Sequence, residues 1–239
     1  MREIIMGEFF GTALLLLLGN GVCASVNAKK SGFEGVGGLT IIIGWGFAVM
    51  IPAYIFGAYS GAHFNPAVTL ALCMTGAVPW EQFPVYVLSQ MAGAIVGAFT
   101  VFLLYQKHFD LMEGQAEGIR GCFCTAPGVP STFHNFLSEA VGTYVLVFAI
   151  LGMAQYPQAG PSGVDKFFLY GIIVSIGCSL GGLTGYAINP ARDLGPRIAY
   201  ALMPLKHKTD PNWGYGWIPV VAPMVGAAVA VLIYNFIFV

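Results

Sequence analysis

The stretch Gly61-Ala62-His63-Phe64-Asn65-Pro66-Ala67-Val68 is repeated in outline by Gly185-Tyr186-Ala187-Ile188-Asn189-Pro190-Ala191-Arg192, and both contain Asn-Pro-Ala. In each, Asn suits the N-cap of a helix and Pro suits its first residue, where a missing N–H costs nothing. A helix that begins inside apolar sequence directs unsatisfied N–H groups and a positive dipole end into its surroundings. At membrane depth such a break is tolerated only beside a watery cavity or buried in protein. The pair therefore predicts one polar passage through a membrane.

Composition supports a membrane protein and excludes several other classes. Of 239 residues, 57% are hydrophobic and 9% are charged, against about 25% charged in ordinary soluble domains. The net charge of −1, without a basic tract, gives no reason to expect nucleic acid as a partner. The five scattered cysteines define no disulfide framework and no metal-ligand spacing. With no nucleophile–base pair or phosphate-binding loop, we predict no enzymatic activity, no metal and no cofactor.

Hydropathy predicts how the chain crosses the membrane. Six runs reach or approach the roughly 20 apolar residues that a crossing needs: 4–25, 38–57, 83–105, 136–156, 167–182 and 216–239. Between them, residues 65–75 and 190–203 predict two short helices of roughly 15–20 Å at 1.5 Å per residue. The fold class is therefore an all-α membrane protein with six transmembrane helices plus two re-entrant half-helices. We expect the glycine-rich approaches to both Asn-Pro-Ala motifs to be extended, with carbonyls facing the pore.

The two halves of the chain resemble each other. Glu8-Phe9-Phe10-Gly11-Thr12 is echoed by Glu139-Ala140-Val141-Gly142-Thr143, and an Asn-Pro-Ala motif follows each at a comparable distance. Each half has three spans, so the second half must enter the membrane from the opposite side. Such inverted repeats place broken helices and the functional site near the midplane. We predict a single transmembrane domain over 1–239, with repeats at about 1–110 and 131–239 joined by an extramembrane loop.

The paired Asn-Pro-Ala motifs, the repeated Glu-x-x-Gly-Thr and this layout resemble the major intrinsic protein (aquaporin) family. Asp193 directly after Arg192, the basic Arg197 and the pair Pro219-Val220 are similar to its glycerol-facilitator branch. The resemblance implies a passive channel for small uncharged solutes such as glycerol, with some water permeability, that excludes protons and ions. It also implies a homotetramer in the cell membrane.

By the same resemblance, Trp45, Gly177, Tyr186 and Arg192 form a narrow selectivity filter. Trp45 and Tyr186 would form an aromatic corner for an alkyl backbone, and Arg192 would offer up to five N–H donors to solute oxygens. Gly177, without a side chain, would leave room. Tyr186 departs from the Phe that is common in this branch, so its hydroxyl leaves the preferred solute open. Two alternatives remain: Trp45 as a buried aromatic with its indole N–H paired elsewhere, and Arg192 as a structural charge at a helix end.

The motifs Asn65-Pro66-Ala67 and Asn189-Pro190-Ala191 would lie at the pore centre, with both asparagine amides donating into the lumen. Each helix start carries about half a positive charge. Two such starts and Arg192 would form an electrostatic barrier to cations and hydronium, as in aquaporin-type pores.

Four further residues are assigned to the pore mouth or to support. Glu8 and Glu139 would hold the segments before the half-helices by accepting backbone N–H bonds; the alternative is proton coupling, as intramembrane carboxylates do in transporters. Asp193 would pair with backbone or with Arg197. His63 resembles a pore-mouth histidine, and a structural role for it is equally open.

Three other functions stay open. A channel of this class could instead carry dihydroxyacetone, urea or protonated lactic acid, because of Tyr186. A proton-coupled secondary transporter would share the inverted repeats and broken helices. A structural or adhesive membrane protein could have the same fold with a closed pore.

The orientation in the membrane is predicted less directly. An even number of spans puts both termini on one side, and the resemblance implies the cytoplasmic side. With cytoplasmic termini, most loop cations would lie outside the cell: Lys29, Lys30, Lys107, Arg120, Lys206 and Lys208. The positive-inside rule therefore favours the opposite orientation. We expect cytoplasmic termini, since two specific motifs outweigh a statistical rule.

Overall fold

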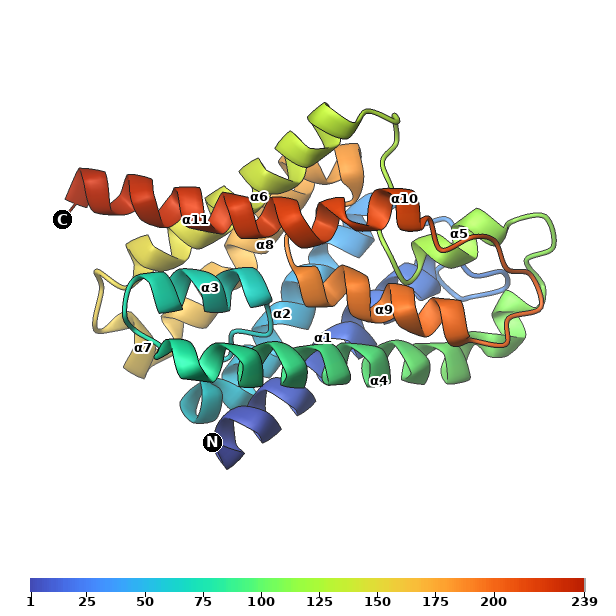
Figure 1. The fold of residues 1–239 in the computed structure, drawn as a ribbon. Coiled ribbons are helices and arrows are strands. Elements are labelled where there is room, and N and C mark those ends of the chain that lie inside the picture. The colour runs from blue at the N-terminus through green and yellow to red at the C-terminus, as the bar shows by residue number, and fades with distance from the viewer. Residues whose placement is uncertain (239) are drawn as a thin grey trace.

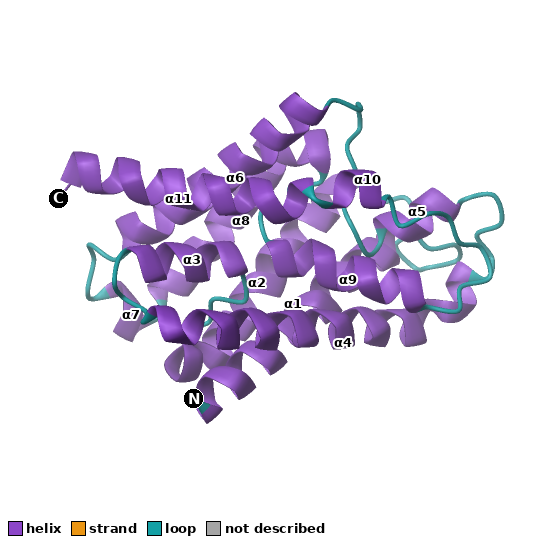
Figure 2. Cartoon of the chain, viewed as in Figure 1, coloured by secondary structure: helices purple, strands orange, loops and turns teal. Residues whose placement is uncertain are grey.

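The computed structural model describes residues 1–238, and every regular element in that range is a helix (Figure 2). Six helices are long and apolar enough to cross a membrane. They are α1 (Arg2–Asn27), α2 (Gly38–Ser60), α4 (Phe83–Phe109), α6 (Thr132–Met153), α8 (Val164–Thr184) and α11 (Ile218–Phe238). The predicted all-α fold with six transmembrane helices is confirmed.

Two shorter helices begin at the Asn-Pro-Ala motifs. They are α3 (Pro66–Met74), of 9 residues, and α9 (Pro190–Leu202), of 13 residues. At 1.5 Å per residue they are roughly 14 and 20 Å long, which together is close to the about 30 Å of a hydrocarbon core. Figure 1 shows α3 and α9 in line, end to end, between α4 and α11. Together the two half-helices complete a seventh crossing.

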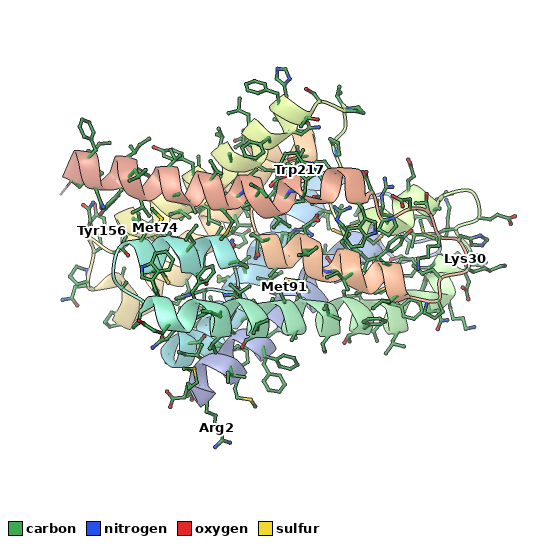
Figure 3. The ribbon with its side chains drawn as sticks, viewed as in Figure 1. Arg2, Lys30, Met74, Met91, Tyr156 and Trp217 are labelled. Atoms are coloured by element: carbon green, nitrogen blue, oxygen red, sulfur yellow. The ribbon has the colours of Figure 1, made fainter. Side chains whose placement is uncertain are left out.

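Four short helices lie in the connections. The 3-10 helix η1 (Trp80–Gln82) leads into α4, and α10 (Trp213–Gly216) leads into α11. The α4–α6 connection contains α5 (Ala116–Gly121), and the α6–α8 connection contains α7 (Ala159–Ser162). Figure 1 places α7 and both chain termini toward one end of the bundle and α5 toward the other. Lys30 lies toward the α5 end, away from Arg2 (Figure 3).

Glycines let the long helices pack with their backbones in contact. A Cβ added at Gly93 of α4 would lie 2.2 Å from the carbonyl oxygen of Phe9 in α1. The matching Gly226 of α11 would place a Cβ 2.1 Å from the carbonyl oxygen of Ala140 in α6. Close approach of this kind is the usual use of small residues between membrane helices. The same packing in both halves gives the inverted repeat its frame.

The approaches to the two half-helices differ from the expected extended backbone. Helices α2 and α8 continue to Ser60 and Thr184, further than their apolar runs, and end at Gly61 and Gly185 with φ of 82° and 84°. Glycine commonly ends a helix in this left-handed conformation, because it has no Cβ to clash. The glycines therefore terminate helices and are not extended pore-lining backbone.

Within the two approaches, four residues that are not glycine also have positive φ: Ala62 (53°), Phe64 (48°), Tyr186 (37°) and Ile188 (43°). Left-handed backbone costs roughly 1–2 kcal/mol for a residue with a side chain. Such conformations persist only where the surrounding structure determines them, and they gather at functional sites. In both approaches the two non-glycine residues with positive φ are two positions apart, which indicates one shared structural role. The hydrogen bonds at the half-helix tips, described below, explain this role.

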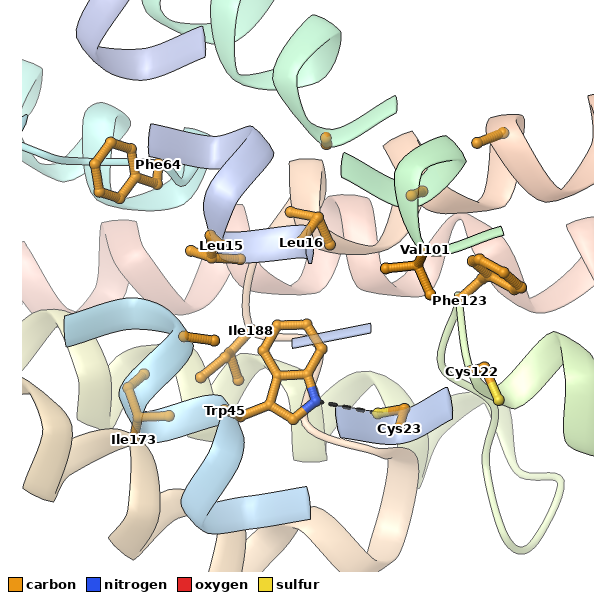
Figure 4. Packing of buried hydrophobic residues seen from close by; sticks show 14 of the residues in the cluster. Leu15, Leu16, Cys23, Trp45, Phe64, Val101, Cys122, Phe123, Ile173 and Ile188 are labelled. Atoms are coloured by element: carbon orange, nitrogen blue, oxygen red, sulfur yellow. Dashed lines mark hydrogen bonds between the residues drawn. The ribbon is translucent and has the colours of Figure 1, made fainter. Parts of the chain in front are cut away.

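The approaches are also part of the main apolar core. Phe64 and Ile188 lie in one cluster of buried side chains with Leu15, Leu16 and Ile173 (Figure 4). The core therefore surrounds the point where the half-helices meet, so it fixes their tips in place.

Candidate functional site

Each half-helix is capped by the asparagine of its motif. The Asn65 Oδ1 accepts the backbone N–H of Ala67 at 2.9 Å. The Asn189 Oδ1 accepts the N–H groups of Ala191 and Arg192 at 3.0 and 3.1 Å. These are the N-cap bonds that an Asn-Pro start favours. They use each asparagine's oxygen and leave its NH2 group to point away from its own helix.

The two asparagines bond across the meeting point. The Asn65 Nδ2 donates to the carbonyl oxygen of Ile188 at 2.8 Å, and the Asn189 Nδ2 donates to that of Phe64 at 2.8 Å. The left-handed backbone of Phe64 and Ile188 accompanies these carbonyl contacts. We expected both NH2 groups to be free for the lumen. Since an amide carries two N–H donors, one of each is used here and one remains.

A narrow cavity of about 70 Å³ passes this meeting point. Its polar lining residues are His63, Asn65, Asn189 and Arg192, with Tyr186 beside them. The remaining lining is largely aliphatic, including Leu15, Val49, Leu146, Ile150 and Ile173. The cavity is therefore apolar with a few polar groups, which suits a small solute that has both alkyl carbons and oxygens.

A second, larger cavity of about 320 Å³ continues from the first. The two share Ala62, His63, Val68, Ile150 and Leu169 as lining residues. The larger one extends to the α6–α8 connection, where Asp165 and Lys166 line it. A path therefore runs from the Asn-Pro-Ala motifs toward the α7 end of the molecule.

Trp45 and Arg192 are in contact at the other end of the narrow cavity. The Cζ of Arg192 lies 4.0 Å from the centroid of the Trp45 ring, a cation–π geometry. Trp45 is 4% exposed and Arg192 is 8% exposed. The indole Nε1 donates to the Cys23 Sγ at 3.3 Å (dashed in Figure 4). The indole N–H of Trp45 is thus paired outside the cavity, but the Trp45 ring still lines the cavity, where a solute can contact it.

Tyr186 fills the space that we expected Gly177 to leave open. A Cβ added at Gly177 would lie 3.0 Å from the Tyr186 Cζ and 2.9 Å from the Ile42 Cγ2. At Gly181, one turn later, it would lie 2.7 Å from the Tyr186 Cδ1. The expectation of free room beside Gly177 is therefore wrong, because the two glycines of α8 accommodate the tyrosine ring.

Two polar atoms at this end have no partner among the described residues. They are the hydroxyl oxygen of Tyr186 and the Nη1 of Arg192, and both are buried. Leaving such groups unpaired costs roughly 1–3 kcal/mol each. A molecule that offers oxygen acceptors in the cavity would relieve this cost.

Glu8 holds the approach to α3. Its Oε1 accepts from the Ser60 hydroxyl at 2.7 Å and from the His63 N–H at 3.0 Å. Its Oε2 accepts from the Phe64 N–H and the Gln90 Nε2, both at 2.7 Å. Both carboxylate oxygens are thus engaged, and they hold the strained backbone of residues 61–64.

Glu139 holds the approach to α9 in the same way. Its Oε1 accepts from the Thr184 hydroxyl at 2.7 Å and the Ala187 N–H at 3.0 Å. Its Oε2 accepts from the Ile188 N–H at 2.8 Å. Both glutamates are fully buried, and each is surrounded by donors, as a buried carboxylate requires.

His63 lies where the two cavities join. Its ring stacks on Tyr86, with centroids 4.3 Å apart and planes at 10°. Its Nδ1 lies 3.1 Å from the Thr69 hydroxyl, which also accepts from the Gln90 Nε2 at 3.1 Å. The histidine therefore has structural contacts on one side and faces the path on the other.

Asp193 and Arg197 form a buried ion pair in α9. The Asp193 Oδ1 lies 2.8 Å from the Arg197 Nε and 2.7 Å from its Nη2. The other carboxylate oxygen accepts from the N–H and the hydroxyl of Thr125 at 2.8 and 2.6 Å. Arg197 donates back to the Thr125 carbonyl at 2.8 Å. The pair attaches the α5–α6 loop to the second half-helix.

Several of these partners carry no clear signal in the sequence. Gln90 is an uncharged polar residue inside an apolar span, and polar groups in spans are often functional, so a role for Gln90 at the site could have been predicted. Cys23 and Thr125 could not, because their partners are distant along the chain. Within residues 1–238, no group of three or more His, Cys, Asp or Glu side chains is placed to hold a metal ion.

Comparison with known proteins identifies the family. The family model described as Major intrinsic protein matches residues 1–234. The chain belongs to this family. It is 47% identical over 234 residues to the glycerol uptake facilitator protein of Bacillus subtilis, covering 97% of this chain and 84% of that protein. A Streptococcus pneumoniae protein of the same name is 44% identical, covering 98% and 99%.

A solved structure shows the same fold in this family. The aquaglyceroporin of Plasmodium falciparum superposes with a TM-score of 0.82 at 30% identity, covering 98% of this chain and 95% of that one. The major intrinsic proteins are transporters and not enzymes, and the six spanning helices make this chain a multi-pass membrane protein.

Proposed function

We propose that this chain is a passive channel for glycerol and similar small uncharged solutes, with some permeability to water. The observation that carries the proposal is the narrow, mostly aliphatic cavity with Asn65, Asn189 and Arg192 in its lining. A polyol has alkyl carbons that suit the aliphatic residues and hydroxyl oxygens that accept from these N–H donors. The similarity to two proteins named glycerol uptake facilitators supports the same solute.

We propose that Trp45, Gly177, Tyr186 and Arg192 form the selectivity filter. The contact of Arg192 with Trp45 and the packing of Tyr186 on Gly177 support the grouping. In this role Arg192 and Tyr186 donate to solute oxygens, while the Trp45 ring contacts the alkyl chain. Gly177 acts by making room for Tyr186.

The half-helix tips provide the barrier to ions. The N-terminal ends of α3 and α9 lie close together, because each cap asparagine donates to the carbonyl of the residue that precedes the other cap asparagine. Each tip carries about half a positive charge, and Arg192 adds a full one. Cations and hydronium would be repelled there, whereas neutral solutes would not.

Glu8 and Glu139 act as braces in this proposal. Each accepts N–H bonds from the residues that precede a half-helix. A carboxylate with both oxygens engaged in this way is poorly placed to exchange protons with a transported solute. This supports a channel over a proton-coupled transporter.

Proteoliposomes with the purified chain test the proposal by stopped-flow light scattering. Water, glycerol, dihydroxyacetone, urea and lactic acid are compared at several pH values. We expect glycerol flux that rises linearly with concentration and is indifferent to an imposed pH gradient. Saturating glycerol flux that follows the gradient would identify a coupled transporter. Impermeability to every solute and to water would identify a closed, structural protein.

We propose cytoplasmic termini, a single domain built of two repeats, and a homotetramer with one pore per subunit. The tetramer is checked by the mass of the detergent-solubilised complex. Orientation is tested with cysteines introduced at opposite ends, Val129→Cys and Tyr156→Cys, since these side chains are 75% and 70% exposed. An impermeant maleimide should label V129C from outside intact cells and Y156C only after permeabilisation. The reverse pattern would invert the topology.

The native Cys122 and Cys124 serve as internal controls. Both are 1% exposed. Burial, with the nearby Asp193 charge, raises the pKa of the Cys124 thiol to about 12, and burial raises that of Cys122 well above its usual value. Because the thiolate is the reactive form, neither should be labelled at pH 8 in the folded protein.

A further inference from the structure

The Arg192 side chain depends on Trp45 for its position. Residues 1–238 give Arg192 no ion pair, and its Nη1 has no hydrogen-bond partner. Its backbone N–H bonds Asn189, which fixes the main chain but not the guanidinium. The contact that the structure gives the guanidinium is the Trp45 ring at 4.0 Å. A shift of that ring would therefore move the arginine or leave it unsupported.

Trp45 is in turn held by two residues of α1. Its Nε1 donates to the Cys23 Sγ at 3.3 Å. At its other edge, the six-membered ring lies over Gly19, where an added Cβ would be 2.3 Å from Cζ3 and 2.4 Å from Cη2. Gly19 and Cys23 are four residues apart and so lie on one face of the helix. One edge of the indole is fixed by a hydrogen bond and the other by close packing.

We propose that Gly19 and Cys23 are positioning residues for solute selection, acting through Trp45 on Arg192. This inference rests on the proposed filter role of those two residues. Gly19 leaves the space that the ring occupies, and Cys23 sets the rotation of the ring by accepting its N–H. Sulfur is a weak acceptor, but a rotated indole would bury its N–H without any partner. The Trp45–Arg192 part of the filter thus depends on α1, α2 and α9, although α1 contributes no filter side chain.

Permeability ratios of four variants test the inference. Gly19→Ala should change the glycerol-to-water ratio by about tenfold, because a small displacement of a positioned group has effects of at least this size. Cys23→Ala should change it by about threefold, as expected for one lost hydrogen bond. Cys23→Ser should restore the ratio, because its hydroxyl also accepts an indole N–H. Gly21→Ala is the matched control on the same helix, since an added Cβ there meets nothing within 4 Å.

A ratio separates selection from the amount of folded protein. If G19A and C23A lower all fluxes but have the same glycerol-to-water ratio as G21A, the two residues are merely structural and the inference is wrong. If G19A does not fold, the pair C23A and C23S decides alone, and a ratio that serine does not restore also overturns the inference.

A spectroscopic measurement keeps the test independent of the proposed function. Trp80, Trp213 and Trp217 are replaced by Phe, leaving Trp45 as the single tryptophan. Ultraviolet resonance Raman spectra should then show a hydrogen-bonded indole N–H that weakens in C23A and returns in C23S. Absence of glycerol flux in the unmodified chain would refute the proposed function. An unchanged Raman signal in C23A would refute the positioning inference.

Discussion

The two half-helices begin with the same arrangement of caps and braces but differ in the residues that come after the Asn-Pro-Ala motif. Both have an asparagine cap, a bond to the opposite approach and a buried glutamate that holds the backbone before it. Three residues after the asparagine, however, α3 has Val68 and α9 has Arg192. The arrangement of caps and braces is therefore symmetric, whereas the charge available to a solute lies in the second half.

The next position differs as well, and changes how each half-helix is anchored. Thr69 in α3 joins a network of uncharged donors and acceptors with Gln90 and His63. Asp193 in α9 instead forms an ion pair with Arg197. Arg197 occupies the position that matches Cys73 in α3. The first half is fixed by hydrogen bonds to α1 and α4, and the second by a charged link to a loop. The second half therefore differs from the first both in the charge beside the cavity and in how its half-helix is anchored.

The largest effect on solute selection should follow from making the proposed filter position symmetric. Arg192→Val gives α9 the residue that α3 has, and removes the positive charge and the donors of the filter. We expect the urea-to-glycerol permeability ratio to change by at least about tenfold, equivalent to about 1.4 kcal/mol, and proton leak to rise. Stopped-flow scattering and a pH-sensitive dye in the vesicles measure both. Val68→Leu at the matching position of α3, which changes the cavity lining but no charge, is the control, and equal ratios in R192V and the unmodified chain would remove Arg192 from the filter.

Breaking the ion pair should have the largest effect on stability. Asp193→Thr copies Thr69 and leaves the fully buried Arg197 without its counter-charge. Breaking one side of a buried pair costs roughly 3–5 kcal/mol. The apparent Tm in detergent should fall accordingly, with loss of folded protein at 37 °C.

A double variant sharpens this prediction. Asp193→Thr with Arg197→Cys copies both first-half residues and removes both charges. Replacing a buried pair by uncharged groups is often close to neutral, so part of the lost Tm should return. If the double variant is less stable than D193T, the link of Arg197 to the Thr125 carbonyl matters more than the charge.

A smaller loss of stability should follow from removing one charge from each brace. Glu8→Gln and Glu139→Gln keep the shape but convert one acceptor oxygen to a donor that faces N–H groups. Each should cost roughly 1–3 kcal/mol, and E8Q more, because Glu8 accepts from four donors and Glu139 from three. Thermal unfolding measures both. A larger effect of E139Q would contradict the ranking.

Sequence patterns predicted the parts of this structure that local chemistry determines. Apolar runs define the spans, and Asn65 and Asn189 mark helix starts because the capping bond joins residues only two apart. The partners of these elements could not be predicted in this way. The bonds Asn65–Ile188 and Trp45–Cys23 join residues far apart in the chain, and nothing local to Cys23 indicates them.

The Gly177–Tyr186 contact shows the same limit within the proposed filter. When each position is considered alone, the missing side chain at Gly177 predicts space, and the hydroxyl of Tyr186 leaves the preferred solute open. Packed together, the tyrosine ring lies against the glycine and occupies that space. The size of a pore depends on pairs of positions, so single residues do not determine it.

The smallest effect should follow from removing the hydroxyl of Tyr186, which lies in the same half as the cavity-lining Arg192. Tyr186→Phe deletes a buried group that has no partner within residues 1–238, so stability should stay the same or rise slightly. Loss of one donor to solute oxygens should shift relative permeability by about threefold toward glycerol over dihydroxyacetone and urea, corresponding to about 0.7 kcal/mol. Carbonyl solutes lose more because a carbonyl oxygen can only accept a hydrogen bond, whereas each hydroxyl of a polyol can also donate to an acceptor elsewhere in the cavity. A control is Tyr144→Phe on α6, outside the lining of the cavity. Equal ratios in Y186F and the unmodified chain would mean that the ring of Tyr186, and not its hydroxyl, sets the width of the filter.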